Sequence, residues 1–278
     1  MKYNISCGKI LIDDTSEFLP KHILECGQVF RYLNSDSGYK IFSKKSFCSL
    51  IYIPGYVTID SKDADYFVNY FDLERDYGDI KRRLSGYPLM NEAIGYGYGV
   101  RILNQDPVEM ILSFIISANN NIPRIKAILE RLCMAKGERT RFGYAFPELK
   151  ALKGVNADFY RSIGAGYRAE YLVKTVGMLS EGFDLELGTL PVREARKRLQ
   201  SLSGVGRKVA DCILLFGYHR SEVFPVDTWI EKIYPLLGGE EGKSAVYIAD
   251  KLSEEYGTLA GYAQQYLYYY GRENLKNK

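Results

Sequence analysis

The 278-residue sequence has no run of about 18 apolar residues, the length that a membrane-spanning helix needs. The residues up to Cys7 include no apolar stretch of signal-peptide length, so we expect neither a secretory leader nor a membrane anchor. The five cysteines are scattered, odd in number and never spaced as Cys-x-x-Cys. This pattern favours reduced thiols in a cytosol and disfavours a zinc or iron–sulfur site.

The sequence also has little excess charge. Its 37 basic and 34 acidic residues leave a formal net charge of +3, which does not by itself indicate a nucleic-acid-binding protein. Local basic groups at 81–83 and 193–198 are equally typical of solvated helix faces. With 46% hydrophobic and 26% charged residues, the chain is expected to form one or two globular domains with a sizeable core.

Two regions of the sequence differ in pattern. Up to about residue 60, β-like runs alternate with turn signals at 35–38 and 54–55, and from residue 64 onward the pattern is almost wholly helical. We therefore predict an N-terminal α/β domain over residues 1–104 and a larger helical domain over residues 105–278. The β-like runs are 28–33, 39–42, 48–53 and 56–59.

A central helix is predicted to begin after Asp106. Asp106 as N-cap, Pro107 as first helical residue and Glu109 two positions later form a capping-box pattern. The residues that follow are apolar nearly all round, which is typical of a buried helix. Residues 117–121 interrupt this helix, and a second helix is predicted from Pro123 to a glycine C-cap at Gly137.

The most informative segment, 202–208, reads Leu-Ser-Gly-Val-Gly-Arg-Lys and lies between two helical patterns. Gly204 and Gly206, on either side of Val205, allow a sharp turn and a close approach of the backbone to a phosphate. A helix that begins here would add its unpaired N–H groups to that anion site. An ordinary corner between two helices is the alternative, but the full string favours a DNA-binding helix-hairpin-helix near 192–218.

Lys208 is predicted to lie in the first turn of the second helix. There the helix dipole and partial burial would both lower its pKa. An amine that is partly neutral near pH 7 can attack a deoxyribose C1′ atom, expel the base and leave a Schiff base. Asp227 can stabilise the positive charge that develops on the sugar, and it can also cap the helix that begins at Thr228. A solvated surface lysine is the alternative for Lys208.

These residues resemble the helix-hairpin-helix (HhH-GPD) DNA glycosylases, and more closely their 8-oxoguanine DNA glycosylase/AP lyase branch. The resemblance implies an α+β fold, with a TBP-like N-terminal antiparallel sheet and helices packed on a larger all-helical body. It implies a base-excision repair enzyme that removes 8-oxoguanine through a lysine Schiff base and nicks the strand by β-elimination. The matching motifs are CGQVFR from Cys26, YFDL from Tyr70, NQDP from Asn104, residues 113–124, GYRA from Gly166 and AGYAQ from Ala260.

The resemblance also assigns roles to residues around the extruded base. Gln264 would hydrogen-bond its Watson–Crick edge, Tyr268 would stack on its ring and Cys212 would cover the other ring face. The Gly27 carbonyl would accept the N7–H that 8-oxoguanine has and guanine lacks. The residues alone show only that Gln264 and Tyr268 share a helix face, and simple packing within a tyrosine run is the alternative for Tyr268.

A second set of residues is implied to contact the opposite strand. Asn119 would enter the space left by the extruded base, and Tyr167 would wedge the stack. Arg124 and Arg168 would donate to the orphaned cytosine, whose acceptors suit arginine better than those of adenine. A preference for 8-oxoguanine opposite cytosine follows. Without the resemblance, residues 119–121 indicate only a turn and an N-cap.

The sequence departs from the family pattern at two positions. Trp229 stands where close relatives commonly carry a histidine that holds a phosphate, which puts that contact in doubt. Ser203 replaces a frequent hairpin proline, so the turn should be looser. The chemistry should need no cofactor. In many relatives carbonyls of this hairpin hold a monovalent cation, and the resemblance implies that the carbonyls of Gln200, Leu202 and Val205 can hold a monovalent or calcium ion.

The expected partner is double-stranded DNA that contains 8-oxoguanine opposite cytosine, bound by a monomer that does not contact a membrane. The expected compartment is a prokaryotic cytoplasm with its nucleoid DNA. A monofunctional alkyl-purine glycosylase of the same superfamily is the first alternative, and Lys208 argues against it. A non-catalytic DNA-binding module is the second, but it would have no reason to pair Lys208 with Asp227.

Overall fold

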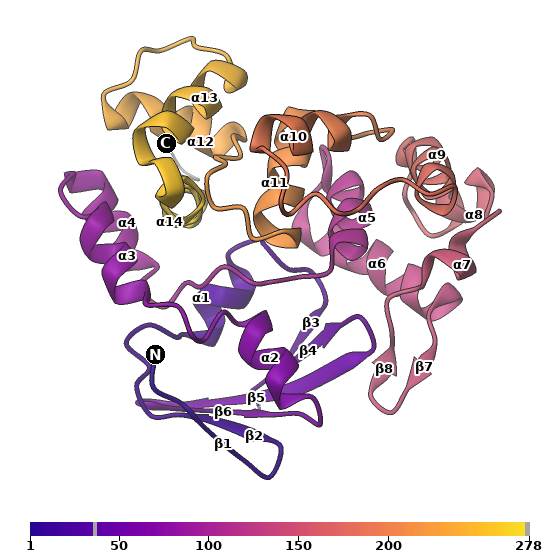
Figure 1. Ribbon diagram of the computed structural model, residues 1–278, viewed down its shortest axis with the longest axis horizontal. Coiled ribbons are helices and arrows are strands. Elements are labelled where there is room, and N and C mark those ends of the chain that lie inside the picture. Colours follow the sequence, from indigo (N-terminus) through magenta and orange to yellow (C-terminus); the bar gives the residue numbers. More distant parts are fainter. Residues whose placement is uncertain (36–37, 276–278) are drawn as a thin grey trace.

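A six-stranded antiparallel sheet forms the lower part of the molecule in Figure 1, and helices form the rest. The computed structural model describes residues 1–35 and 38–275. The strand order is β1-β2-β6-β5-β4-β3. The bounds are β1 Asn4–Ser6, β2 Lys9–Ile12, β3 Tyr32–Ser35, β4 Gly38–Ser43, β5 Ser46–Ile53 and β6 Tyr56–Asp60.

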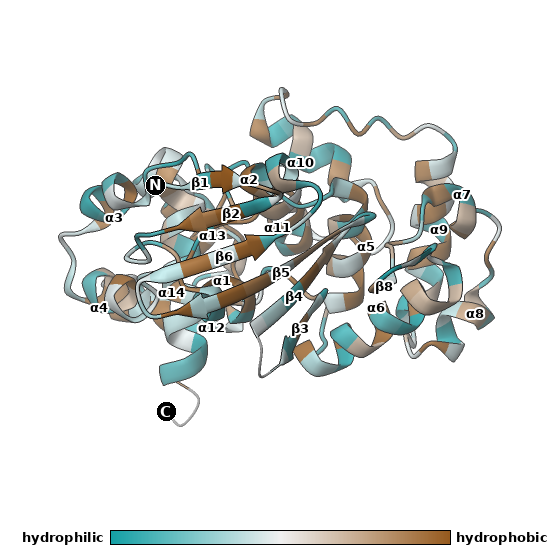
Figure 2. Cartoon of the chain, turned by 90° about the horizontal axis from the view of Figure 1, so that it is seen from below, coloured by the Kyte–Doolittle hydropathy of each residue, from teal (hydrophilic) through white to brown (hydrophobic). Residues whose placement is uncertain are grey.

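Alternation along the strands gives the sheet one buried face. Successive side chains of a strand point to opposite faces, so every second residue can enter the core. Helices α1 (Pro20–Glu25) and α2 (Ala64–Tyr70) pack on that face. Figure 2 shows the sheet from its other face, with the strands in front of the helices. The inward strand residues are Ile10, Ile12, Ile41, Cys48, Leu50, Val57 and Ile59, all fully buried.

The strand predictions are confirmed for β4, β5 and β6, and the predicted turn at 54–55 joins β5 to β6. The prediction of a strand at 28–33 is wrong over residues 28–31, since β3 begins at Tyr32. Gln28 is fully buried, and its side chain bonds backbone groups of Ile23, Arg101 and Leu103, which holds this segment as an irregular loop. Strands β1 and β2 were not predicted, and the turn predicted at 35–38 lies partly outside the described residues.

The rest of the chain is helical apart from a short hairpin, β7 (Arg139–Thr140) and β8 (Gly143–Tyr144). Within the described residues, no helix is both long and apolar enough to cross a membrane. The remaining helices are α3 Tyr77–Leu84, α4 Pro88–Tyr96, α5 Pro107–Ser117, α6 Ile122–Lys136, α7 Leu149–Leu152, α8 Ala157–Ser162, α9 Arg168–Ser180, α10 Val192–Gln200, α11 Arg207–Gly217, α12 Thr228–Ile233, α13 Ala245–Tyr256 and α14 Ala260–Asn274, with short 3-10 turns η1 Tyr234–Leu237 and η2 Gly257–Leu259.

Helix α5 is the central buried helix that the sequence predicts. Asp106 caps it by accepting from the Glu109 N–H at 2.9 Å. The reciprocal half of the predicted capping box does not form, because the Glu109 carboxylate turns toward the sheet. There it accepts from the Lys44 N–H and lies 3.5 Å from Arg31, as a buried ion pair between the sheet and the helices.

The side chains divide into two cores. One lies between the sheet and helices α1 and α2, and the other lies among the remaining helices. Helices α3 and α4 contribute Tyr77, Ile80, Leu84 and Met90 to the second core, although they precede residue 105 in the chain. The predicted border at 104/105 stays a prediction, and spatially the helical body recruits residues from before it.

Candidate active site

The segment between α10 and α11 is a tight hairpin in which each glycine has a different role. Gly204 has φ +83°, and a Cβ atom there would lie 2.8 Å from the Tyr171 side chain, so only glycine fits. Gly206 caps α11 and is exposed, and a Cβ atom there would have open space. The N-terminus of α11 is therefore accessible to an anion. The Ser203 carbonyl accepts from Thr175 at 2.9 Å, which ties the hairpin to α9 without a proline.

A buried carboxylate fixes the start of α11 against α10. Asp211 is fully buried and bonds Arg196 of α10 at 2.6 Å and Arg207 of α11 at 2.8 Å. Arg207 also bonds Asp250 of α13 at 2.6 Å. Burial raises the pKa of Asp211 even though both arginines oppose the shift. Arg196, one of the basic residues at 193–198, is therefore engaged in an internal ion pair and does not face DNA.

Lys208 lines a small cavity, the lysine cavity, together with residues from distant segments. All six residues predicted as catalytic or base-binding line it: Gly27, Lys208, Cys212, Asp227, Gln264 and Tyr268. The sequence argument missed its other lining residues, which are Phe114, Phe216, Pro225 and Gln265. The two phenylalanines follow the spacing of core positions, and no separate signal marks Gln265 beside Gln264.

Lys208 lies in the first turn of α11 as predicted, and its Nζ atom is 5.4 Å from the centre of the Phe114 ring. The predicted fall in its pKa is wrong. Burial does favour the neutral amine, but Cys212 in its thiolate form and Asp227 favour the ammonium form more strongly, so the pKa of Lys208 is raised. Because burial raises the pKa of the Cys212 thiol to about 11, Asp227 is the group of the two that acts on Lys208 near neutral pH. The amine of the free protein is therefore protonated at neutral pH and must lose a proton before it can act as a nucleophile.

Asp227 has the capping role that its sequence context suggests. Its Oδ1 atom accepts from the N–H groups of Trp229 at 3.0 Å and Ile230 at 3.1 Å, at the start of α12. Burial raises the pKa of Asp227, while those hydrogen bonds and Lys208 act in the opposite direction. The cap holds the carboxylate at the cavity wall, so the structural role and a role toward a ligand are compatible.

The lysine cavity has little free volume. Its volume is about 40 Å³, and since a single water molecule needs about 10–15 Å³ of such volume, a purine base does not fit. Tyr268 lies against Gly27, because a Cβ atom on Gly27 would be 2.9 Å from the tyrosine Oη. Gln264 is 5% exposed, and its Oε1 atom has no hydrogen-bond partner in the described structure. A ligand that displaced Tyr268 could therefore donate a hydrogen bond to Gln264 Oε1.

The residues predicted to contact the opposite strand lie together at the junction of α5, α6 and α9. Asn119 is exposed with φ +50°, and the Tyr167 side chain is 56% exposed. Arg124 is exposed and donates to the Gly164 carbonyl at 3.2 Å. Arg168 differs, since it is only 3% exposed and donates to the carbonyls of residues 118, 119 and 165. In this structure Arg168 holds the turn that presents Asn119.

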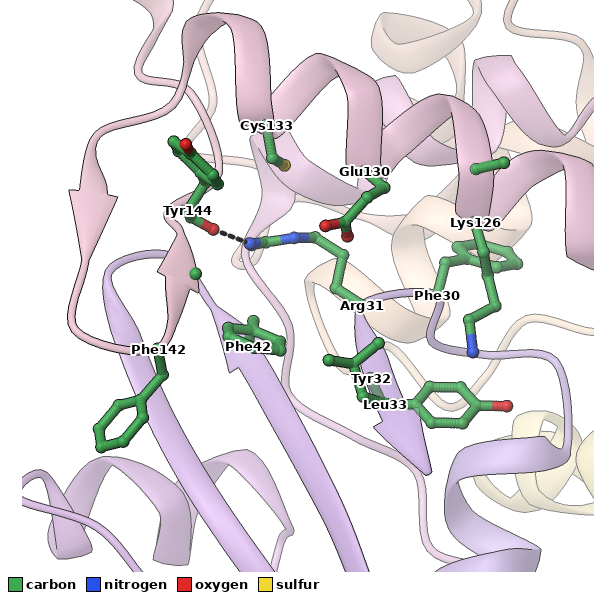
Figure 3. Close-up of a pocket in the computed structure, with 12 residues that line it drawn as sticks. Phe30, Arg31, Tyr32, Leu33, Phe42, Lys126, Glu130, Cys133, Phe142 and Tyr144 are labelled. Carbon is green, nitrogen blue, oxygen red and sulfur yellow. Dashed lines mark hydrogen bonds between the residues drawn. The ribbon is translucent and has the colours of Figure 1, made fainter. Parts of the chain in front are cut away.

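A larger cavity of about 410 Å³ lies elsewhere, between β3 and α6 (Figure 3). Aromatic side chains, Lys126 and Glu130 line it, and Arg31 donates at 2.5 Å to the Tyr144 carbonyl of the short hairpin. None of the residues predicted for catalysis or DNA contact lines this cavity. We therefore place the active site at the lysine cavity, which both Lys208 and Asp227 line, although it is smaller than the cavity between β3 and α6.

Metal-binding side chains do not gather at the site. Within residues 1–35 and 38–275, no group of three or more His, Cys, Asp or Glu residues is placed to hold a metal ion. Trp229 lies beside Lys232, whose Nζ atom is 4.9 Å from the indole ring. The binding of a cation by the hairpin carbonyls stays a prediction, and no phosphate contact is assigned to Trp229.

Two family models match consecutive parts of the chain. The 8-oxoguanine DNA glycosylase N-terminal domain matches residues 10–111, and the HhH-GPD superfamily base excision DNA repair protein matches residues 112–257. The two matches together span most of the sheet and of the helical body, including the hairpin and Asp227, and α14 with Gln264 and Tyr268 follows them.

Similar proteins come from several organisms. A probable N-glycosylase/DNA lyase of Methanothermobacter thermautotrophicus is 32% identical and covers 79% of this chain and 78% of that protein. The N-glycosylase/DNA lyase OGG1 of Arabidopsis thaliana is 34% identical, over 65% of this chain and 54% of that one. The crystal structure of Clostridium acetobutylicum 8-oxoguanine glycosylase/lyase, in complex with double-stranded DNA containing cytosine opposite 8-oxoguanine, has a TM-score of 0.93. Its chain is 37% identical, and 99% of each chain is covered.

Proposed function

The chain belongs to the HhH-GPD superfamily of base-excision DNA repair proteins and has the N-terminal domain of 8-oxoguanine DNA glycosylases, and we propose that it removes 8-oxoguanine opposite cytosine from duplex DNA. It is a bifunctional DNA N-glycosylase and AP lyase. The observation that carries this function is one cavity lined by Lys208, Asp227, Gln264 and Gly27, within a fold that matches a glycosylase/lyase along nearly its whole length.

DNA binding begins at the hairpin. The exposed Gly206 and the N-terminus of α11 offer N–H groups to a phosphate, which fixes the position of the duplex without reading its sequence. The damaged nucleotide then leaves the stack, as a base must to react inside an enzyme pocket. Because the lysine cavity holds about 40 Å³, Tyr268 moves away from Gly27 when the base enters.

The chemistry uses the lysine and the aspartate in turn. The Lys208 ammonium first loses a proton, and the amine then attacks the deoxyribose C1′ atom. The bond from C1′ to the base breaks, and its electron pair leaves with the base. Asp227 stabilises the positive charge that develops on the sugar. The C1′–O4′ bond then opens, its electron pair goes to O4′, and a Schiff base between C1′ and Lys208 results. Removal of a proton from C2′ then expels the 3′ phosphate by β-elimination, which nicks the strand.

Several finer features belong to the same proposal. Arg124, with its exposed guanidinium, donates to the orphaned cytosine, and Asn119 enters the vacated space. The protein acts as a monomer on chromosomal DNA in a prokaryotic cytoplasm, without contact to a membrane. Catalysis needs no cofactor, and the carbonyls of Gln200, Leu202 and Val205 are available to a monovalent or calcium ion.

Borohydride trapping tests the proposal directly. Sodium borohydride reduces a Schiff base to a stable covalent link, so the protein should form a covalent complex with a duplex that contains 8-oxoguanine opposite cytosine. An undamaged duplex should give no such complex. Tight binding to the damaged duplex without trapping would exclude the lysine mechanism, and measurement of free base would then identify a water-using glycosylase.

A further inference from the structure

Two side chains of α14 hold the backbone just before Gly27, the residue whose carbonyl is expected to read the lesion. Gln265 is 2% exposed and donates from Nε2 to the Cys26 carbonyl at 2.8 Å. Arg272 donates from Nη2 to the Glu25 carbonyl. The two carbonyls that precede Gly27 are therefore both tied to the helix that carries Gln264 and Tyr268.

The same helix also covers Gly27 itself. Residues 265, 268 and 272 follow helical spacing, so their side chains share one face of α14. A Cβ atom on Gly27 would lie 2.9 Å from Tyr268 Oη and 3.2 Å from Arg272 Nη1. The guanidinium carbon of Arg272 lies 5.5 Å from the centre of the Tyr268 ring. The loop, the tyrosine and the arginine thus form one packed unit.

The chain after Gly27 is anchored to other parts of the molecule. The Gln28 carbonyl accepts from Gln105 at 2.8 Å, and the Gln28 side chain bonds the backbone of the segment that links the two cores. Further along, Arg31 donates to the Tyr144 carbonyl (Figure 3). These hydrogen bonds hold the chain on the C-terminal side of Gly27, and the contacts with α14 hold it on the N-terminal side.

Gly27 itself has the conformational freedom that makes such anchors necessary. Its φ is +86°, and glycine adopts either sign of φ about equally well. Among the described residues, no group donates a hydrogen bond to the Gly27 carbonyl. Hydrogen bonds weaken steeply when the donor, hydrogen and acceptor depart from a line. The direction of this carbonyl therefore determines how well it accepts from an N7–H group.

We propose that Gln265 and Arg272 are positioning residues that aim the Gly27 carbonyl and thereby set the discrimination between 8-oxoguanine and guanine. This inference rests on the proposed function. A well-aimed carbonyl accepts from N7–H of 8-oxoguanine, whereas it faces the N7 lone pair of guanine. A carbonyl that points elsewhere no longer accepts from N7–H of 8-oxoguanine and no longer repels the N7 lone pair of guanine. Both the rate of 8-oxoguanine excision and the preference for 8-oxoguanine over guanine therefore fall.

The test compares two reactions of the full chain that share Lys208 but differ in whether a base is recognised. Single-turnover excision of 8-oxoguanine needs the Gly27 contact, whereas cleavage at a preformed abasic site does not. Gln265→Met and Arg272→Met remove the donors but keep extended side chains. Tyr270→Phe is the matched control, since it removes a hydrogen bond from the same helix to Glu92.

Each methionine variant should slow excision about tenfold and narrow the binding preference for 8-oxoguanine over guanine duplexes by a similar factor, which is the effect of one well-formed hydrogen bond. Abasic-site cleavage by Arg272→Met should stay near the wild-type rate, as should both reactions of Tyr270→Phe. Gln265 lines the lysine cavity, so Gln265→Met should lose more of its excision rate than of its abasic-site cleavage. Arg272→Lys retains a donor and should recover part of the preference.

An equal loss of excision and abasic-site cleavage would overturn the inference, and so would an unchanged preference for 8-oxoguanine over guanine. Either result would leave the two residues as structural supports of the loop. If Gln265→Met does not fold, the result for Arg272→Met tests the inference. Arg272 lies nearer the surface, with a side chain 12% exposed, so its substitution should disturb the fold less. A wild-type protein without lesion-dependent excision would instead refute the proposed function itself.

Discussion

The two groups of predicted residues differ in how the fold prepares them. The lysine cavity draws its residues from α5, α11, α14 and two loops, its lining residues are buried or half-buried, and it has little free volume. The opposite-strand group comes from one surface junction, and Asn119, Arg124 and Tyr167 are exposed there. The lysine cavity therefore has its reacting groups in place but must open, whereas the opposite-strand surface is open before DNA arrives.

The two groups should therefore contribute differently to repair, one to the chemical step and the other to selectivity for the opposite base. Charges inside a water-poor cavity act strongly on a transition state, because little solvent screens them. Exposed donors exchange water for a base, so their net effect is smaller. Substitutions at the lysine cavity should therefore affect the chemical step most, and substitutions at the exposed surface should affect selectivity most.

Lys208→Gln should give the largest effect. The variant loses the nucleophile but keeps a side chain of similar length, so it should bind the damaged duplex and show neither excision nor borohydride trapping. Lys251→Gln, an exposed position on α13, is the control and should behave as the wild type. Substantial strand cleavage by Lys208→Gln, measured on denaturing gels, would remove this lysine from the mechanism.

Asp227→Asn should give the next largest effect. Asparagine is as good an N-cap as aspartate, so α12 should keep its cap and the melting temperature should change little. The lost charge should raise the barrier to base loss by about 2–4 kcal/mol, the usual cost of removing an electrostatic stabiliser. Single-turnover base release measures this change. A wild-type rate would leave Asp227 as a helix cap alone.

The pH dependence of excision tests the raised pKa of Lys208. Below that pKa, the neutral fraction of the amine increases about tenfold for each pH unit, so the single-turnover rate should rise with pH from 6 to 9. Asp227→Asn should keep the same slope at a lower rate, which assigns the titration to the lysine. A rate that is flat across this range would show that the amine is already neutral in the complex.

Much of the fold followed from local patterns in the sequence. The alternation in β4 to β6 and the apolar run of α5 depend on neighbouring residues, and the structure confirms them. The segment 28–31 has a β-like composition, but it is a loop because Gln28 bonds backbone groups on both sides of it. The Glu109 side chain likewise does not complete the predicted capping box, because it pairs with Arg31, which is distant in sequence and lies 3.5 Å away.

The active-site residues were predictable through motifs, and their environment was not. Lys208 and Asp227 were assigned from the hairpin string and the resemblance, and the structure brings both to one cavity. The direction of the lysine pKa shift depends on groups that only the fold brings close, Asp227 among them, whereas the helix dipole and partial burial predicted the opposite sign. Arg168 resembles a base reader in sequence, but only the structure shows that three backbone carbonyls use its donors.

Arg124→Ala should give the smallest effect and sharpen the contrast between the two groups. The loss of one exposed hydrogen-bond contact costs about 1 kcal/mol, so excision opposite cytosine should slow about fivefold. Excision opposite adenine should change less, because arginine donors match adenine poorly. Arg131→Ala is the matched control, since Arg131 lies on the same helix and donates at 2.7 Å to the Ile163 carbonyl. An equal loss opposite all four bases would show that Arg124 contributes to binding alone and that cytosine selectivity arises elsewhere.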